Sequence, residues 1–423
     1  MYFEDLLMTF SLYADASRRA RLTAHAALFV RLVLVVLLGF TLACSDSDDD
    51  DNSNPTPTTP NLDNLKADIA ENYATLVHTS YLDSLQLASA MQTTIVAFVN
   101  NPNAETHAAA KEAWLAARVP YGQTESYRFY DGPIDDENGP EGALNAWPLD
   151  ENYIDYVTGF PDTGIVNDPV NFPELTKELL RDLNEKDGEA NISTGFHAIE
   201  FLLWGQDGFV DGPGQRSHVD FVLEDAAASN QDRRGQYLLL VTEMLIEDLQ
   251  FLVGAWAPDQ SGNYRETFVA DGDEALRSIL LGIGSLSGAE LAGERMAVAL
   301  DTREQEDEHS CFSDNTHIDI IMNALGIKNV YLGRFETTSG VVHDGPGLDE
   351  LMSFVDDTLN QEMLAQLDAV ETACAAIPVP FDQAIRTESG RPIVQTAVDE
   401  LRAQTTLIVS IAEALDITLN LEE

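Results

Sequence analysis

Residues 62–98 read "LDNLKADIAENYATLVHTSYLDSLQLASAMQTTIVAF", and this stretch decides the fold class. Apolar side chains recur in it at steps of three to five residues: Ile69, Tyr73, Leu76, Tyr81, Leu85, Ala88, Met91, Ile95 and Phe98. An α-helix completes a turn in about 3.6 residues, so these side chains share one face. The stretch therefore predicts a long helix that buries one face.

The same helical pattern continues along the rest of the chain. Further helices are expected at 104–118, 172–186, 193–204, 236–256, 264–283, 287–301, 315–325, 347–376 and 392–417. Alternation with a period of two residues, the mark of half-buried strands, is scarce. We therefore expect an all-α fold of two helical-bundle-like domains, 62–255 and 256–423, with a distant duplication left open.

Two connections between the expected helices are unusually long. Residues 119–170 are rich in Gly, Pro, Asp and aromatic side chains, and residues 301–317 are densely polar. Loops of this length in a compact domain tend to be functional or disordered. The many aromatic side chains of the first loop argue against a simple disordered linker, so both loops are candidates for a functional site.

The charge of the chain restricts its partners. Among 423 residues, 72 Asp and Glu stand against 23 Lys and Arg, which gives a net charge of −49. Such a surface repels nucleic-acid phosphates and anionic lipids and attracts cations. Nucleic acid is therefore not expected as a partner, and the acidity also fits a solvated surface in a saline environment.

The N-terminal region has the composition of an export signal. Arginines precede the apolar run "LVLVVLLGF" (32–40), and "TLACS" (41–45) follows it. A basic region, a short apolar core and a small residue before the cut predict a signal peptide at 1–43, because the run is too short for a transmembrane helix. Cys44 resembles the lipidated cysteine of bacterial lipoproteins, and an ordinary cleaved signal is the alternative.

The residues after Cys44 extend this prediction to a membrane anchor. Ser45 after the cysteine favours the outer membrane, with the periplasmic or the surface side left open. Residues 44–61 are acidic and almost without apolar side chains, so they predict a disordered tether. An oxidising envelope permits a disulfide between Cys311 and Cys374, and two free buried thiols are the alternative.

The motif "STGFHAIE" (193–200) is the first candidate site. His197 and Glu200 stand three residues apart, so a helix places them on one face, where they can bind one transition-metal ion. Gly195 near the helix start would let another group approach the backbone closely. The pattern is common, and a hydrogen-bonded structural pair is the alternative.

The segment "EDEHSCFSDNTH" (306–317) is the second candidate site. We expect His317 first, with Glu306 or Asp314, to complete a metal site with His197 and Glu200. The alternative is that these acids face water or cap helices, with Ser313 or Asp314 as the N-cap of the helix at 315. The chain has no HExxH motif, so the zinc-protease pair of helix-borne histidines is missing.

Several blocks together resemble the imelysin family. They are "AWLAARVPYGQTESYRF" (113–129), "GPID" (132–135), "NAWPLD" (145–150), "STGFHAIEFLLWGQD" (193–207), "EDEHSCFSDNTH" (306–317) and "NVYLGRF" (329–335). The resemblance covers about 62–420. It implies an all-helical envelope protein, often a lipoprotein, with a link to iron acquisition and a site between two domains. Its GxHxxE motif corresponds to Gly195, His197 and Glu200.

These observations lead to one main hypothesis and two alternatives. The main one is an outer-membrane lipoprotein that binds iron, zinc or an iron-bearing ligand and acts with an outer-membrane iron receptor or transporter. Arg118, Tyr121, Gln123 and Glu125 are expected to line its cleft, with anchoring of the loop as the alternative. The alternatives are a zinc-dependent peptidase in which Glu200 is the catalytic residue, since the family is named for a peptidase, and a non-catalytic surface scaffold.

Overall fold

The computed structural model describes residues 61–223 and 229–421. The predicted signal peptide, the lipidation site Cys44 and the acidic tether up to residue 60 lie outside the described residues and stay predictions. The described residues belong to one compact unit, Pro60–Glu423.

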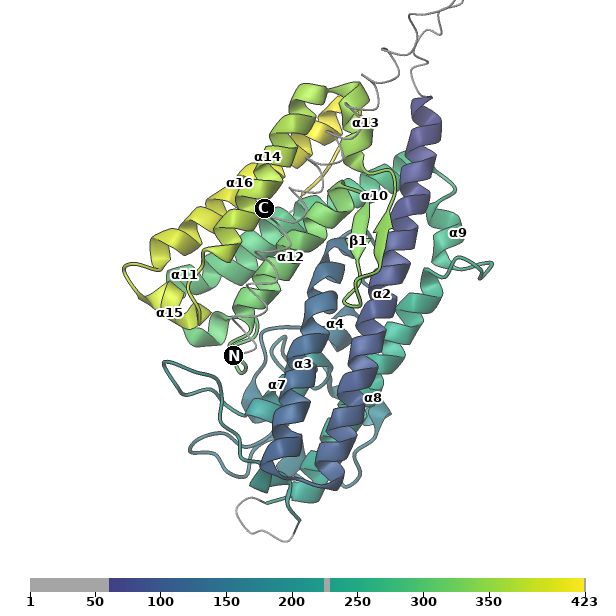
Figure 1. The fold of residues 1–423 in the computed structure, drawn as a ribbon. Coiled ribbons are helices and arrows are strands. Elements are labelled where there is room, and N and C mark those ends of the chain that lie inside the picture. The colour runs from purple at the N-terminus through teal and green to yellow at the C-terminus, as the bar shows by residue number, and fades with distance from the viewer. Residues whose placement is uncertain (1–60, 224–228, 422–423) are drawn as a thin grey trace, which may run out of the picture. The chain divides into compact units, whose positions relative to one another are not determined.

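The first group of helices packs along α2 (Leu62–Asn100). Helix α3 (Ala104–Thr124) runs beside it, and α8 (Gln231–Ala255) packs on it as well (Figure 1). The short turn between α2 and α3 is fixed by Asn103, whose side chain accepts from the backbone N–H of Thr106 in a reciprocal capping box. The predicted helix at 62–98 is therefore confirmed, with its apolar face in the core.

The second group is built on a long bent helix. It starts with α10 (Gly272–Ser285), continues through the π-helical segment η4 (Leu286–Ala297) and ends with α11 (Val298–Thr302). This run, Gly272–Thr302, is long and apolar enough to cross a membrane, but 72% of its most apolar window is buried in the fold, as in a core helix. Helix α16 (Arg391–Ala414) packs against η4 and against α14 (Asp357–Ala375).

Helix α12 (Thr316–Tyr331) joins the two groups. It packs against α3 of the first group and against α14 and η4 of the second (Figure 1). The contact between α3 and α12 crosses the expected boundary at 255 and 256, and the division into two bundles stays a prediction.

The remaining elements are short. They are η1 (Glu125–Tyr127), α4 (Glu141–Leu144), α5 (Glu151–Ile154), η2 (Ile165–Asn167), α6 (Lys177–Leu183), α7 (Gly195–Trp204), η3 (His218–Phe221), α9 (Tyr264–Phe268), η5 (Gln305–Asp307), α13 (Leu348–Val355), α15 (Phe381–Arg386) and the strands β1 (Arg334–Glu336) and β2 (Val342–Asp344). The two strands pair antiparallel, with Phe335 opposite His343.

The expected all-α class is confirmed, and the differences concern helix ends. The single helices expected at 264–283 and 347–376 are each divided in two, because Asp271 and Asp356 cap a new helix inside each range. The helix expected at 172–186 shortens to α6. The β1–β2 hairpin is not predicted, because strands of three residues are too short to show an alternating pattern.

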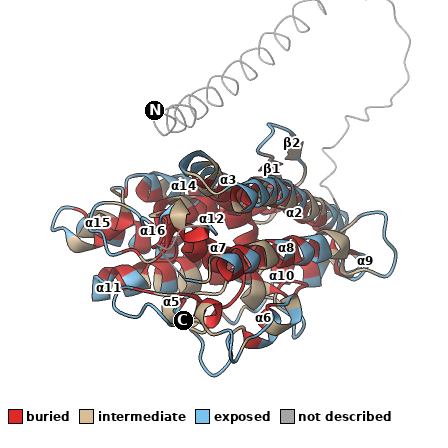
Figure 2. Ribbon diagram, turned by 90° about the horizontal axis from the view of Figure 1, so that it is seen from below, coloured by how far each residue is buried: buried red, intermediate tan, exposed pale blue. Residues whose placement is uncertain are grey.

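The core is one continuous cluster through both groups of helices. Buried residues line the inner parts of the helices and exposed residues the outer parts (Figure 2). The structure decides two points about particular side chains that the sequence left open. Cys311 and Cys374 are free buried thiols, so the permitted disulfide is not formed. The N-cap of α12 is Asn315, and neither Ser313 nor Asp314 takes that position.

Candidate functional site

Helix α7 carries the GxHxxE motif into the interior, and all ten of its residues are buried. Gly195 begins the helix with a φ of +85°, and a Cβ there would stand 2.6 Å from the Leu144 carbonyl oxygen. Only glycine combines this backbone conformation with so close an approach. The expectation that Gly195 permits a close backbone approach is confirmed, and the approaching group is the end of α4.

His197 and Glu200 lie against each other on α7. The Nδ1 atom of His197 is 2.9 Å from Oε2 of Glu200, and both side chains are fully enclosed. The other carboxylate oxygen of Glu200 accepts from the backbone N–H of Ser313 at 2.9 Å and from its hydroxyl at 2.6 Å. The Ser313 side chain thus binds Glu200, which ties α7 to the loop before α12.

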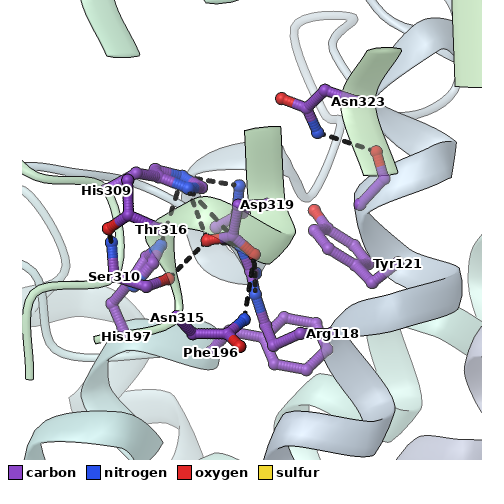
Figure 3. A network of polar contacts seen from close by, with 12 residues as sticks. Arg118, Tyr121, Phe196, His197, His309, Ser310, Asn315, Thr316, Asp319 and Asn323 are labelled. Atoms are coloured by element: carbon purple, nitrogen blue, oxygen red, sulfur yellow. Dashed lines mark hydrogen bonds and ion pairs between the residues drawn. The ribbon is translucent and has the colours of Figure 1, made fainter. Parts of the chain in front are cut away.

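The partner of His197 in the second candidate segment is His309. The Nε2 atoms of the two imidazoles are 3.3 Å apart (Figure 3). On its other side, Nδ1 of His309 is 3.0 Å from a carboxylate oxygen of Asp319, on the first turn of α12. The Ser310 hydroxyl also donates to Asp319. Both histidines therefore turn Nδ1 toward a carboxyl group and Nε2 toward each other.

Arg118 of α3 fixes this arrangement from the first group of helices. Its Nε and Nη2 atoms approach the two oxygens of Asp319 at 3.1 and 3.0 Å, and its Nη1 donates to Asn145 Oδ1 at 2.6 Å. The Asn145 amide nitrogen in turn lies 3.3 Å from Nε2 of His309. We call Arg118, Asn145, His197, Glu200, His309 and Asp319 the histidine network.

A second ion-pair cluster supports the network from the π-helical segment. Arg295 donates to Glu125 at 2.6 Å and to Asn323 of α12 at 2.7 Å. Its other contact is Glu290, five residues earlier, which the π-helix brings to the same side. Burial opposes the charged form of Glu125, but Arg295 and Arg128 outweigh it and lower the Glu125 pKa to about 2. Glu125 is therefore an ionised structural anchor.

The protonation states in the network follow from these contacts. Burial disfavours the charge of Asp319, but Arg118 and His309 hold its pKa far below the usual range, so Asp319 is ionised and accepts from His309 Nδ1–H. Burial lowers the pKa of His309 to about 4, with Arg295 adding to the effect. Burial also lowers the His197 pKa, and it raises the Glu200 pKa to about 8.

At neutral pH these values give one chain of donors. A protonated Glu200 donates to His197 Nδ1, His197 Nε2–H donates to His309 Nε2, and His309 Nδ1–H donates to Asp319. If Glu200 loses its proton, His197 holds its own proton on Nδ1, and two nitrogen lone pairs face each other at 3.3 Å. A cation that accepts both lone pairs relieves this contact.

The other predicted site residues lie at different places. His317 is buried on α12, with Nδ1 3.0 Å from the Asp314 carbonyl oxygen, and the ring against His197 is that of His309. Glu306 is exposed and Asp314 half-buried, and both belong to a separate group of carboxyl groups near Asp207. Glu200 carries no bond to either, so the expected grouping around His317 is not formed.

The four expected cleft residues are buried in the packed interior. Arg118 and Glu125 are in the ion-pair networks, and Tyr121 packs its ring 4.7 Å from that of Phe196. Gln123 accepts from Asn329 at 2.9 Å. All four therefore support the site from within.

One member of the network, Asn145, was missed as a site residue. His309 and Asp319 belong to the acids and histidines of 304–319 that the sequence offers as partners of His197 and Glu200, but His317 was preferred to them; they stand ten positions apart. The bend of the loop at Asp314 (φ 57°) and the start of α12 bring them together. A sequence pattern shows neither the bend at Asp314 nor the way α12 starts. Asn145 itself stands in the block "NAWPLD", two residues before the partly exposed Trp147, whose ring is 4.9 Å from that of His197.

The fold and site together define an all-helical protein with a buried histidine–carboxylate network between packed helices. Residues 77–408 match the family profile described as Imelysin. Iron-regulated protein A of Synechococcus elongatus is 28% identical over 330 residues, which make up 75% of this chain and 76% of that protein. The chain belongs to the imelysin family.

Two solved structures share the fold. One is of a candidate iron-regulated protein A precursor from Parabacteroides distasonis, with a TM-score of 0.64 and 21% identity over 86% of this chain and 97% of that one. The other is of an imelysin-like protein from Psychrobacter arcticum, with a TM-score of 0.57 and 12% identity over 86% and 98% of the two chains. At these identities the likeness concerns the fold.

Proposed function

We propose that this protein binds a transition-metal ion, iron or zinc, between the Nε2 atoms of His197 and His309, and that it serves iron acquisition in the cell envelope. The observation that carries this proposal is the pair of Nε2 atoms 3.3 Å apart with a carboxyl group behind each ring. The similarity to iron-regulated protein A supports the link to iron.

The residues present fit a metal ion in two respects. Two imidazole nitrogens that bind one ion at 2.0–2.1 Å in tetrahedral geometry stand about 3.3 Å apart. Metal-binding histidines usually donate their second ring N–H to a carboxylate, which fixes the tautomer. Asp319 has this relation to His309, and Glu200 would have it to His197 once the bound ion displaces the Glu200 proton. Glu200 is therefore proposed to orient His197 and not to bind the ion.

The chain itself offers two ligands at this point. Within residues 61–223 and 229–421, no group of three or more His, Cys, Asp and Glu side chains is arranged to hold an ion. The proposed ion would therefore need further ligands that these side chains do not supply, and the burial of both histidines favours small ones such as water. The metal itself would supply Lewis acidity or redox chemistry to such a ligand.

A peptidase is less well supported by the same contacts. A general base must reach the proton that it removes. One oxygen of Glu200 accepts two hydrogen bonds from Ser313 and the other faces His197, so both are occupied within the protein. The arrangement favours binding over hydrolysis.

The proposed place of action is the outer membrane, with Cys44 as the lipid anchor and an iron receptor or transporter as partner. These proposals depend on the sequence of residues 1–61. Labelling of the full chain with a fatty-acid analogue, compared with a Cys44→Ala variant, tests the anchor.

The metal site is tested by titrating the chelator-treated protein with metal ions. The ions are Fe²⁺ under anaerobic conditions, Zn²⁺ and the spectroscopic probe Co²⁺. We expect one equivalent to bind and the visible Co²⁺ bands to indicate nitrogen ligands. A His197→Ala/His309→Ala variant should lose this binding, and His343→Ala on the β2 strand serves as the control. If the double variant binds as the unchanged protein does, the assignment is wrong.

A further inference from the structure

A further polar cluster, with three buried members and the half-buried Asp314, lies beside the histidine network. It consists of four carboxyl groups, Asp207, Glu308, Asp314 and Asp382, which act on one another electrostatically. We call them the carboxylate cluster. They come from the turn after α7, from the loop before α12 and from α15, so the tertiary structure assembles them.

Hydrogen bonds hold the three segments of this cluster together. The side-chain amide of Gln305 donates to Asp207, and that of Gln383 donates to the Val210 carbonyl oxygen. The backbone N–H of Gly214 donates to the Phe312 carbonyl at 2.9 Å. The carboxyl groups thus have a fixed frame.

Glu308 is the central observation. Its side chain is 0% exposed, and within the described residues neither of its carboxylate oxygens has a hydrogen-bond partner. The Thr316 hydroxyl is a hydrogen-bonding neighbour that favours the ionised form of Glu308, and the nearby charged groups are Asp382, Asp314 and Arg386. A buried carboxyl group without a partner is costly, so its retention points to a missing ligand.

Asp382 repeats the pattern from the opposite segment. It is 1% exposed, and its Oδ1 atom has no hydrogen-bond partner in the described part of the chain. Its other oxygen is 3.5 Å from Arg386, whose side chain is 31% exposed and therefore partly screened by solvent. The same arginine also acts on Glu308, so one partly exposed guanidinium faces both buried carboxyl groups.

We propose that Glu308 and Asp382, with Asp314 and Asp207 beside them, bind a hydrated divalent cation of the Mg²⁺ or Ca²⁺ type. Carboxylate oxygens are the ligands that these hard cations prefer, and Mg²⁺ commonly keeps several water ligands and uses one or two carboxylates. Within the described residues no group of three or more His, Cys, Asp and Glu side chains is arranged to hold an ion, so the proposed ion would be held by one or two carboxylates and by water.

This site is distinct from the histidine pair in its chemistry. It offers oxygen donors, whereas the histidine pair offers nitrogen donors. Glu308 directly precedes His309, so the bound ion would also fix the backbone that carries His309.

The test measures binding of MgCl₂ and CaCl₂, separately, to the chelator-treated protein by isothermal titration and by the shift in Tm. We expect saturable binding of one of the two ions and at least a tenfold loss of affinity in Glu308→Gln and in Asp382→Asn. Glu362→Gln, an exposed carboxylate on α14, is the matched control and should bind as the unchanged protein does.

Three results would overturn the proposal. They are no saturable binding of either ion by the unchanged protein, unchanged affinity in both cluster variants, or loss of affinity in the Glu362→Gln control. Circular dichroism checks folding, and if Glu308→Gln does not fold, Asp382→Asn decides. The His197→Ala/His309→Ala variant should keep Mg²⁺ or Ca²⁺ binding, and loss of binding there would overturn the separation of the two sites.

Discussion

The loop before α12 contributes adjacent residues to two polar clusters. The clusters differ in whether their buried polar groups have partners. His309 joins the histidine network, where within residues 61–223 and 229–421 no buried side-chain nitrogen or oxygen of the six members lacks a hydrogen-bond partner. Glu308 joins the carboxylate cluster, where both of its oxygens lack one. The difference lies in the neighbours: Arg118 arrives from α3 to balance Asp319, while Glu308 faces further carboxyl groups.

The stability of the two clusters should therefore respond oppositely to the loss of a carboxylate. In the histidine network a carboxylate is a required partner, so its removal leaves charged or polar groups unpaired. In the carboxylate cluster a carboxylate adds repulsion in the absence of a cation. The following predictions test this contrast.

The largest effect is expected from Asp319→Ala. It leaves the fully buried guanidinium of Arg118 without its ionic partner, which costs about 3–5 kcal/mol of unfolding free energy. Urea denaturation measures the loss. The exposed Asp399 of α16 gives the control, since Asp399→Ala should change stability by less than about 0.5 kcal/mol. A loss below about 1 kcal/mol in Asp319→Ala would contradict the proposed role.

Gly195→Ala should have the next largest effect. Its φ of +85° costs an alanine about 1–2 kcal/mol, and the contact of 2.6 Å with the Leu144 carbonyl adds about 1–3 kcal/mol. Gly262→Ala is the matched control, because Gly262 has a φ of +77° and open space around it. Thermal unfolding should show the larger loss at Gly195, and equal losses would remove the steric part of the explanation.

Two substitutions of Glu200 should show whether its charge or its hydrogen bonds stabilise the fold. Glu200→Ala leaves the Ser313 N–H and His197 without a partner and should cost about 1–3 kcal/mol. Glu200→Gln keeps an acceptor for Ser313 and a donor for His197 Nδ1, and it resembles the protonated carboxyl group, so it should cost less than about 1 kcal/mol. Urea denaturation at pH 7 compares them, and a Gln variant as unstable as the Ala variant would argue for an ionised Glu200.

The last expected effect is a pH dependence in the carboxylate cluster, which solvent screening reduces because Asp314 is half-buried. Burial, with Asp207 and Asp382, raises the pKa of Asp314 to about 7, against about 3.9 for an unfolded aspartate. The folded state therefore binds a proton that the unfolded state releases between these values. The stability that Asp314 contributes is present below about pH 4 and is lost as the pH rises through about 7.

Asp314→Asn removes this dependence and suits the backbone, since asparagine tolerates the φ of 57° at this position. In cation-free buffer, the Tm of the unchanged protein should fall more between pH 4 and 7 than that of the variant. Asp399→Asn should retain the slope of the unchanged protein. Parallel curves for all three proteins would show that Asp314 is not a source of the repulsion.

Much of the fold could be predicted from the sequence because helix periodicity is a local property. The apolar spacing in residues 62–98 predicted α2, and the run at 236–256 predicted most of α8. Helix ends were less accurate where one aspartate, Asp271 or Asp356, interrupts a long periodic stretch. The pairing of the short strands β1 and β2 had no local signal.

The candidate site was predicted in part for the same reason. Gly195, His197 and Glu200 lie close together in one short helix, so their spacing alone brings them together. Whether His309 or His317 contacts His197 depended on which face of the loop and of α12 turns toward α7. That choice is set by long-range contacts such as Ser313 with Glu200 and Arg118 with Asp319.

The sequence by itself determined the helical class, the acidic charge, the GxHxxE motif and the membership of the imelysin family, since each resides in local order or composition. The tertiary structure alone decided which of the many acids and histidines of 304–319 meet. It placed Arg118 beside Asp319 across 201 residues of chain and left Glu308 facing Asp382. Pairing of buried charge depends on what lies opposite in space, and no pattern along the chain records that.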